Sequence, residues 1–279
     1  MPYPQVSYNE RVPTPMRQPT HSIVIPAYNE SERLTVSIPK VQEYVCQRGL
    51  DAEIIVVNDG SRDDTAAVVR RSAASDPSIL LVENPGNRGK GYSVRNGMLH
   101  ARGALALFTD ADLSSPISEA DKLFEALAKG SDVAIGSRWL KRELQTERQP
   151  WYRQLYGRLF NVALRIVLGL SFKDTQCGFK AFNRQAIDTI FTRQQIERWG
   201  FDPELLFLAG KFRLKTVEVA VEWAHDHRSK IHPLRDGLRM AAEMLRVRWN
   251  DWTGRYRKPL FARVSQSLDS SPAPVSQKL

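Results

Sequence analysis

The sequence has few cysteines and no long hydrophobic run. Only two cysteines, Cys46 and Cys177, occur among the 279 residues, and neither belongs to a pairing pattern or to a metal-binding spacing. This scarcity indicates a reducing compartment, so we expect a cytoplasmic protein with buried thiols. The longest strongly apolar stretch, 160–170, contains Arg165 and is shorter than the roughly 20 residues of a membrane span. We therefore expect no transmembrane helix.

The two ends of the chain have little of what a folded domain requires. Residues 1–20 contain five prolines and lack the charged start and apolar run of a signal peptide, which predicts a flexible leader. Serine, proline, glutamine and charged residues dominate the other end, which predicts a disordered tail over 255–279. Between them, 21–254 is expected to form a single domain with one core.

The formal net charge of +9 favours anionic partners, namely nucleic acid, phosphorylated small molecules or an acidic lipid surface. A basic protein that binds nucleic acid normally shows a known binding module, or aromatic residues interleaved with its basic patch. We find neither, so no nucleic-acid partner is expected. A basic nucleic-acid-binding protein remains only a remote alternative.

The first half of the chain alternates short β-branched runs with helical patterns, which predicts an α/β fold with a mostly parallel, Rossmann-like sheet flanked by helices. The predicted strands are 22–25, 53–57, 79–82, 104–108 and 133–135, and the predicted helices are 31–47, 63–74, 90–102 and 117–129.

After residue 138 this alternation is lost, and a mixed region is expected. It should contain a helix at 151–170, a hairpin near 178–182, a helix at 203–211, a strand at 216–223 and a helix at 234–249. The segments 151–170 and 234–252 combine arginine with tryptophan, leucine, methionine or phenylalanine at helical spacing, as interfacial helices do. The other interpretation of both stripes is core packing.

The most informative stretch, A-L-A-L-F-T-D-A-D-L-S-S-P at 104–116, ends a predicted strand with two carboxylates. Asp110 and Asp112 stand at i and i+2 and so face the same side of an extended chain. In open parallel sheets, ligands bind beyond the carboxyl ends of the strands. Two such oxygen donors suit Mg²⁺ or Mn²⁺, which can also bind a diphosphate. The alternative is a solvated turn whose aspartates cap the next helix.

Two further strand ends carry polar residues. Asp59 and Gly60 follow the second predicted strand, where Asp59 could accept from a base or a ribose while Gly60 allows a close approach. The alternative there is a tight turn with an Asx cap. Pro26, Tyr28 and Glu30 form a third set at the end of the first strand. The three ends should meet at one rim.

The segment G-N-R-G-K-G-Y-S-V-R-N-G at 86–97 fails both common phosphate-binding patterns. Lys90 is followed by glycine rather than serine or threonine, which excludes a P-loop, and Val94 occupies the third glycine position of a dinucleotide fingerprint. A glycine-rich loop leading into a helix remains, with Arg88 and Lys90 available to an anionic donor. The alternative is a flexible basic turn.

The motifs I-P-A-Y-N-E, V-N-D-G-S, N-R-G-K-G and T-D-A-D-L occur in this order and resemble the inverting family 2 glycosyltransferases of GT-A fold. The segments G-S-R at 136–138, D-T-Q-C-G-F-K at 174–180, G-F-D-P-E-L-L at 200–206 and R-S-K at 228–230 are similar to the polyprenyl-phosphate branch, which comprises dolichyl-phosphate glucosyltransferases and mannosyltransferases. The resemblance implies a nucleotide-sugar half at 21–138 and an acceptor half at 139–254.

The resemblance also implies roles for single residues. Donor nucleotide binding falls to Pro26, Tyr28, Glu30, Asp59, Gly60, Lys90 and Asp110, and metal binding to Asp110 and Asp112. The acceptor phosphate would meet Arg138, Arg153, Arg228, Ser229 and Lys230, and the catalytic set would be Asp110, Asp112 and Arg138. Ser114 stands where polyprenyl-phosphate members often have a glutamine in the metal shell, and Gly157 where some mannosyl members have an acceptor-contacting serine.

The acceptor could be a lipid phosphate or a hydroxyl. A hydroxyl must lose a proton as it attacks and needs a general base, for which Asp174, Asp202 and Glu204 are candidates. A lipid phosphate is already an anion and needs cations instead, which the many Arg and Lys residues after 133, Lys180 included, can supply.

We therefore expect transfer of a hexose, glucose from UDP-glucose in preference to mannose from GDP-mannose, to a polyprenyl or dolichyl phosphate. A family 2 enzyme that acts on a glycan or small-molecule hydroxyl is the alternative. A lipid acceptor and no spanning helix imply peripheral docking on the cytoplasmic face of a membrane.

Overall fold

The computed structural model describes residues 18–141, 143, 162, 164–224 and 233–263. Its centre is a seven-stranded sheet in the order β3-β2-β1-β4-β6-β5-β7. The strands are β1 His21–Ala27, β2 Ala52–Asn58, β3 Ile79–Glu83, β4 Leu105–Phe108, β5 Val133–Ser137, β6 Lys180–Asn183 and β7 Thr216–Ala220. All neighbours pair in parallel except β6, which runs antiparallel to β4 and β5.

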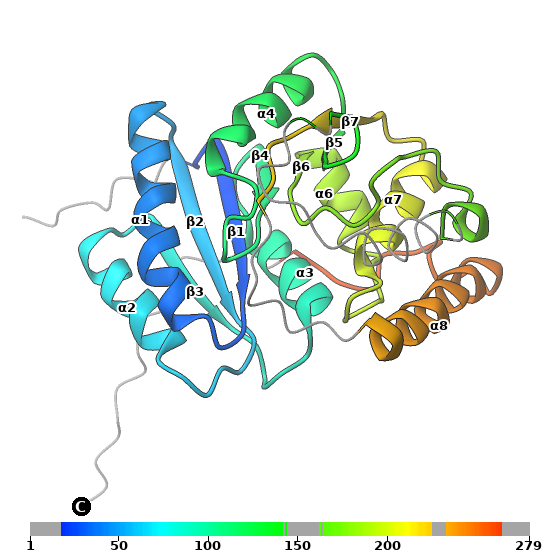
Figure 1. The fold of residues 1–279 in the computed structure, drawn as a ribbon, viewed down its shortest axis with the longest axis horizontal. Helices are drawn as coiled ribbons and strands as arrows, with labels where there is room; N and C mark the ends of the chain where they lie inside the picture. The colour runs from blue at the N-terminus through cyan, green and yellow to red at the C-terminus, as the bar shows by residue number, and fades with distance from the viewer. Residues whose placement is uncertain (1–17, 142, 144–161, 163, 225–232, 264–279) are drawn as a thin grey trace, which may run out of the picture.

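Helices cover both faces of the sheet (Figure 1). One face packs against α1 Ser31–Gln47, α2 Thr65–Ser75 and α4 Ala120–Ala128, which follows the short 3-10 helix η1 Ile117–Glu119. The other face packs against α3 Lys90–His100, α6 Arg184–Ile190, α7 Phe201–Lys211 and α8 Pro233–Trp252. Two apolar cores result, one on each side of the sheet.

The sequence of the central strands explains this double burial. In β1, Ile23 and Ile25 belong to one core while Val24 belongs to the other, and β2 divides its β-branched residues in the same way. A strand that is buried on both faces reads as a continuous hydrophobic run. The predicted α/β class, the five strands and the four helices of the first half are confirmed.

The second half departs from prediction in two places. The hairpin expected near 178–182 is wrong, because the chain there forms β6, which inserts between β4 and β5. Helix α6 was not predicted. It begins directly after β6, where the Asn183 side chain accepts a hydrogen bond from the backbone N–H of Ala186 at 2.8 Å. Such a cap satisfies one of the unpaired donors at a helix start.

The boundary expected for the disordered tail, residue 255, is wrong, because ordered structure continues beyond it. Tyr256 is fully buried in the core beneath α7 and α8, and the backbone N–H groups of Leu260 and Phe261 donate to the carbonyl of Thr192 at 2.8 and 3.1 Å. The composition of the tail is averaged over all its residues, so it gives no sign that these few apolar residues pack against the domain. Of the helix expected at 151–170, residues 162 and 164–168 are helical, and the other positions except 169 and 170 lie outside the described residues.

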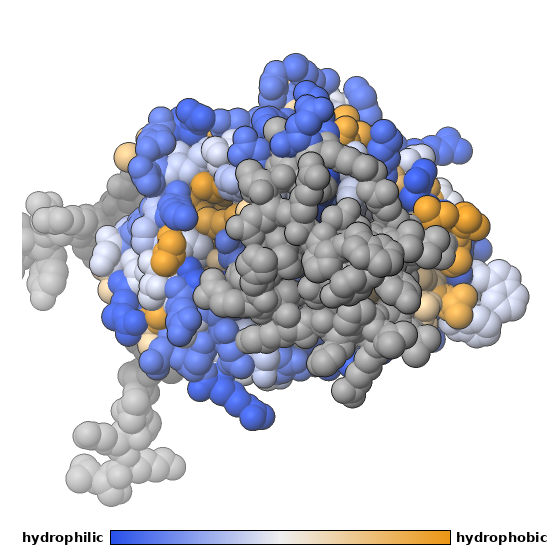
Figure 2. Space-filling model, in the orientation of Figure 1, coloured by the Kyte–Doolittle hydropathy of each residue, from blue (hydrophilic) through white to orange (hydrophobic). Residues whose placement is uncertain are grey.

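Among the described residues, no helix is both long and apolar enough to cross a membrane. Outside the grey residues, the face shown in Figure 2 is largely hydrophilic, with orange patches at the right-hand edge, near α8 of Figure 1, and others on the left. The exposed apolar side chains of α8 are Leu245, Trp249 and Trp252, and Val162 and Ile166 are exposed on the helix that contacts α8. These two helices are joined by a hydrogen bond of 2.6 Å from Arg248 Nε to the carbonyl of Val167.

Candidate active site

The carboxyl ends of β1, β2 and β4 lie at one edge of the sheet, as parallel pairing requires. Ala27 pairs in register with Asn58, and Val24 with Phe108. The backbone N–H of Asp59 donates to the carbonyl of Ala27 at 2.8 Å, and that of Thr109 to Val24 at 3.0 Å. The structure therefore brings together the three polar strand ends named from the sequence.

The segment after β1 is tied to the segment after β2. Asn29 has a left-handed φ of 54°, and its side-chain oxygen accepts from the backbone N–H of Arg62 at 2.8 Å. Glu30 accepts two hydrogen bonds from Arg33 at 2.8 and 2.7 Å. Tyr28 lies between these anchored residues and β1 and keeps 39% of its surface exposed. Pro26 lies inside β1, where it is buried.

Asp59 is buried and holds the glycine-rich loop. One carboxylate oxygen accepts from Asn84 Nδ2 at 2.8 Å and from the backbone N–H of Arg88 at 2.9 Å, and the other accepts from the N–H of Gly89 at 2.8 Å. A carboxylate offers about four lone-pair positions. Asp59 thus spends most of its acceptor capacity on this loop, and its predicted contact with a base or ribose stays a prediction.

Glycines bring this loop against its neighbours. Gly60 has a φ of 68°, and a Cβ there would lie 2.6 Å from the backbone carbon of Gly86. At Gly91 a Cβ would lie 2.6 Å from the carbonyl oxygen of Ile196. The backbone N–H of Tyr92 already donates to the carbonyl of Glu197 at 2.9 Å. The glycines thus serve close packing of protein against protein, and part of the α3 N-terminus is taken by protein acceptors.

This packing positions the side chain of Lys90 in the site. Its ammonium lies 2.5 Å from Asp110 Oδ1. Burial works to lower the pKa of Lys90, but Asp110, Asp202 and Asp112 together outweigh it and hold that pKa above its usual value. Behind Asp110 the chain passes at Gly178, where a Cβ would overlap the carboxylate. Lys90 and Asp110, both predicted to bind the donor, are therefore direct neighbours.

Asp112 points its carboxylate back at its own turn. Its Oδ1 accepts from the backbone N–H of Ser114 at 2.9 Å, and Leu113 between them adopts a left-handed φ of 49°. Such a conformation is uncommon for a branched residue and is found where surrounding structure imposes it. The extended chain expected over Asp110 and Asp112 is thus wrong: the two aspartates belong to a turn in which the backbone N–H of Leu113 donates to the carbonyl of Asp110 at 3.1 Å. The described residues contain no group of three or more His, Cys, Asp and Glu side chains that could hold a metal.

Arg138 is bound by a buried partner. Its Nε and Nη2 donate to the two oxygens of Asp174 at 2.7 and 2.9 Å, and its backbone N–H donates to Asp174 at 3.0 Å. Burial alone would raise the pKa of Asp174, but Arg138 holds it below its usual value. The guanidinium also lies 5.4 Å from the centre of the Trp223 ring. Of the other predicted acceptor residues, Arg153, Arg228, Ser229 and Lys230 lie outside the described residues.

A second buried pair lies beside the first. Lys180, at the start of β6, has no exposed surface and donates to Asp202, at the start of α7, and to the carbonyl of Cys177 at 2.5 Å. Burial raises the pKa of the Cys177 thiol to about 12, so this cysteine is a packed, protonated group. The expectation of buried thiols holds for Cys177 only, since Cys46 is exposed. The Arg138–Asp174 pair links the two predicted halves, and Asp202 of the second pair is close enough to Lys90 to help raise the pKa of that lysine.

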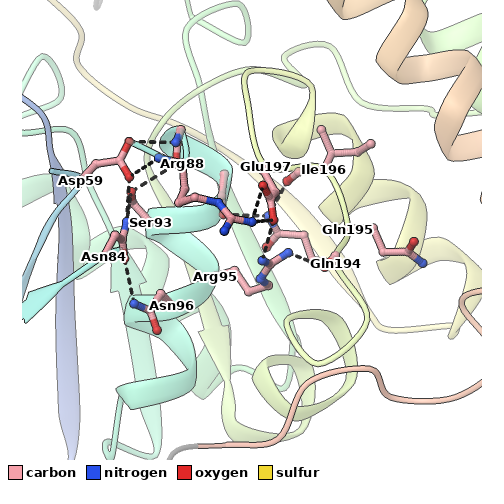
Figure 3. A network of polar contacts seen from close by, with 12 residues as sticks. Asp59, Asn84, Arg88, Ser93, Arg95, Asn96, Gln194, Gln195, Ile196 and Glu197 are labelled. Atoms are coloured by element: carbon pink, nitrogen blue, oxygen red, sulfur yellow. Dashed lines mark hydrogen bonds and ion pairs between the residues drawn. The ribbon is translucent and has the colours of Figure 1, made fainter. Parts of the chain in front are cut away.

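Figure 3 shows a polar network that sequence patterns gave no means of finding. Glu197 accepts from Arg88 at 3.0 Å and from Arg95 at 3.3 Å, which ties the glycine-rich loop and α3 to the segment before α7. That segment is held from below by Glu204. Its two oxygens accept from the backbone N–H groups of Gln195 and Ile196 at 2.9 and 2.8 Å.

Glu204 has no exposed surface, and Tyr256 completes its hydrogen bonding with a hydroxyl donor at 2.6 Å. Burial raises the pKa of Glu204 to about 7, against the opposing effect of these three donors. The C-terminal segment therefore supports the loop that in turn holds Arg88.

The sequence model described as Glycosyl transferase family 2 matches residues 22–191, a range that contains the ends of β1, β2 and β4 together with Arg138 and Lys180. The chain belongs to glycosyltransferase family 2.

Curated members of the family resemble this enzyme over most of their length. A dolichyl-phosphate β-glucosyltransferase of Trichomonas vaginalis is 38% identical over 251 residues, which cover 85% of this chain and 76% of the relative. The human dolichyl-phosphate β-glucosyltransferase is 34% identical over 265 residues, 89% of this chain and 81% of the relative. The resemblance to the polyprenyl-phosphate branch is thereby confirmed.

Solved structures confirm the predicted GT-A fold of this glycosyltransferase. Glucosyl-3-phosphoglycerate synthase from Mycobacterium tuberculosis in complex with phosphoglyceric acid has a TM-score of 0.62 and 20% identity, covering 82% of this chain and 80% of that chain. Its complex with Mn²⁺, UDP and glucosyl-3-phosphoglycerate has a TM-score of 0.60 and 21% identity, covering 86% and 81%. Another of its complexes contains Mg²⁺ and UDP.

Proposed function

We propose that this family 2 glycosyltransferase transfers glucose from UDP-glucose to a polyprenyl phosphate of the dolichyl type. The choice of acceptor rests on one observation: the three carboxylates that could act as a general base are already bound by partners within the protein. Asp174 is held by Arg138, Asp202 by Lys180, and Glu204 by two backbone N–H groups and Tyr256. An acceptor that is already an anion needs no base, so it suits this arrangement better than a hydroxyl does.

The names of the relatives support the same acceptor and sugar, since the Trichomonas vaginalis and human relatives are dolichyl-phosphate β-glucosyltransferases. Support for the donor comes from the UDP complexes of the structural neighbour, which shares only the fold. The nucleoside would bind at the sheet edge that carries Pro26, Tyr28, Glu30, Asp59 and Gly60.

Asp110 and Asp112 would hold Mg²⁺ or Mn²⁺. Two carboxylates on one turn fit a hard cation that takes its remaining ligands from diphosphate oxygens and water. Such a cation supplies charge neutralisation for the leaving diphosphate. Lys90, which lies against Asp110, can add a second positive charge at the same place.

The chain's own residues then have a definite task. A phosphate oxygen of the acceptor attacks the anomeric carbon from the face opposite the diphosphate, the bond to that diphosphate breaks, and the anomeric configuration inverts. Arg138, with Arg153, Arg228, Ser229 and Lys230 as further predicted contacts, would hold the acceptor phosphate against the repulsion of the donor. The rigid pairing of Arg138 with Asp174 fixes its guanidinium in place before the acceptor arrives.

We further propose that the enzyme docks on an acidic membrane through α8 and the helix that contacts it. Trp252 and Ile166 are 78% and 76% exposed, and Leu245 and Trp249 continue the same apolar surface. Arg246 and Arg248 are also exposed on α8. Apolar side chains flanked by arginines are suited to the interface of a bilayer with anionic lipids.

The test is a transfer assay with radiolabelled UDP-glucose, Mn²⁺ and polyprenyl phosphate. We expect label in the lipid extract, in a product with a single phosphate by mass spectrometry. The matched acceptor control is the corresponding polyprenol, which lacks the phosphate and should receive no label. Transfer to polyprenol or to a glycan, with none to polyprenyl phosphate, would establish the hydroxyl-directed alternative.

A further inference from the structure

Trp199 presents a large aromatic ring at the edge of the site, although the backbone around it is fixed. The indole side chain is 43% exposed. On one side the Glu197 carbonyl accepts from Tyr92 at 2.9 Å, and on the other the N–H of Gly200 donates to Glu243 at 2.7 Å. A Cβ at Gly200 would lie 2.6 Å from the Glu243 carboxylate, so this turn is closely packed. The exposure of the ring is therefore set by the fold.

The ring lies next to the groups that would bind the diphosphate. Lys90 Nζ lies 5.5 Å from the centre of the Trp199 ring and 2.5 Å from Asp110 Oδ1. The indole is thus separated from the Asp110 carboxylate by one side chain. A hexose in a nucleotide sugar is bonded directly to the diphosphate, so a group beside the diphosphate site is placed to meet the sugar.

We propose that Trp199 is a specificity-determining residue that stacks against the glucosyl group of the donor. This inference rests on the proposed function. The equatorial hydroxyls of glucose leave apolar C–H groups on both faces of the ring, and an indole can cover one of these faces. Mannose and galactose carry their axial hydroxyl on the same face of the ring, so an indole that covers this face of the donor sugar favours glucose over both.

The competing explanation is a structural one, in which the ring only steadies the Lys90 ammonium. The two explanations differ in what they predict for UDP. A ring that touches the sugar contributes nothing to UDP binding, whereas a ring that acts through Lys90 affects UDP and UDP-glucose alike.

Calorimetric titration with UDP and with UDP-glucose, both in Mn²⁺ and without lipid, separates them. We expect Trp199→Ala to weaken UDP-glucose binding roughly 5- to 10-fold, in line with the energy of an aromatic contact, and to leave UDP within about twofold. Trp199→Phe should recover part of the loss. Trp252→Ala removes an equally large exposed indole far along α8 and should change neither affinity.

The preference of the wild-type enzyme for UDP-glucose over UDP-galactose should shrink in Trp199→Ala by the same factor. Equal weakening of UDP and UDP-glucose, or no weakening of either, would overturn the inference. A higher KM for polyprenyl phosphate with an unchanged affinity for UDP-glucose would also overturn it, because the ring would then face the acceptor. If the wild-type enzyme itself does not bind UDP-glucose, the proposed donor is wrong and the inference falls with it.

Discussion

Removing one hydroxyl from the buried Tyr256 should make the stability of this enzyme more sensitive to alkaline pH. The hydroxyl donates at 2.6 Å to Glu204, whose pKa is raised by burial to about 7. Between the ordinary pKa of a glutamate, 4.5, and this raised value, the folded protein binds a proton that the unfolded chain has released. Stability from this group is therefore fully present below pH 4.5 and is lost as pH rises through 7.

The size of the effect follows from the charge of the acceptor. At pH 8 the Glu204 carboxylate is mostly ionised, and a hydrogen bond to a charged group contributes about 1.5–3 kcal/mol. At pH 5.5 the carboxyl is mostly protonated, and the bond is worth about 0.5–1.5 kcal/mol. Tyr256→Phe should thus lower the free energy of unfolding by about 1 kcal/mol more at pH 8 than at pH 5.5.

The measurement is equilibrium urea unfolding of wild type and variant at both pH values, followed by tryptophan fluorescence. All other titrating groups are common to the two proteins and cancel in the difference. Tyr44→Phe is the matched control, because it removes a 2.8 Å phenol–carboxylate hydrogen bond to Asp121, whose side chain is 41% exposed. Its loss should be the same at both values. A Tyr256→Phe loss that is equal at pH 5.5 and pH 8 would refute the reasoning.

Three further changes test the site and the surface. Gly178→Ala should lower kcat/KM at least about 10-fold with little change in Tm, because the new methyl group displaces the Asp110 carboxylate. The control is Gly210→Ala in α7, where the new methyl group meets open space and activity should stay within about twofold. Asp112→Ala should lower turnover at least about 100-fold and abolish the thermal shift caused by Mn²⁺ while the circular dichroism spectrum stays unchanged; retained turnover would exclude the metal role. Replacing Trp249 and Trp252 together by serine should weaken cosedimentation with anionic vesicles at least about 10-fold and leave UDP affinity unchanged; undiminished vesicle binding would remove α8 from the docking surface.

The first half of the fold could be predicted because its signals are local. The β-branched run of β1 and the helical spacing of α1 each lie within one element, and strand ends meet at one edge in any parallel sheet. The convergence of Asp59 and Asp110 followed from that rule alone. Local spacing could not predict that Gly60 packs against Gly86, or that the glycine-rich loop hydrogen-bonds to Asp59.

The second half depends on pairings between residues distant in sequence. Strand β6 pairs with β4 across more than 70 residues, and Tyr256 reaches Glu204 across 52. Hydrophobic periodicity reports which face of an element is buried, not which partner covers it. Asp174 and Asp202 could be named from motifs, but their commitment to Arg138 and Lys180 required the tertiary structure.

The charges of the site explain why a divalent cation suits it. Four carboxylates, those of Asp110, Asp112, Asp174 and Asp202, stand close to the three cations Lys90, Arg138 and Lys180. Formally this cluster is negative by one charge, which opposes a diphosphate and, still more, a second phosphate from the acceptor. One divalent cation at Asp110 and Asp112, as proposed above, would reverse that sign. The proposed metal would compete with Lys90 for the Asp110 carboxylate, so the Lys90 ammonium would be free to turn toward the diphosphate once that metal is bound. The ion pairs of the site and the proposed metal requirement would then have the same electrostatic cause.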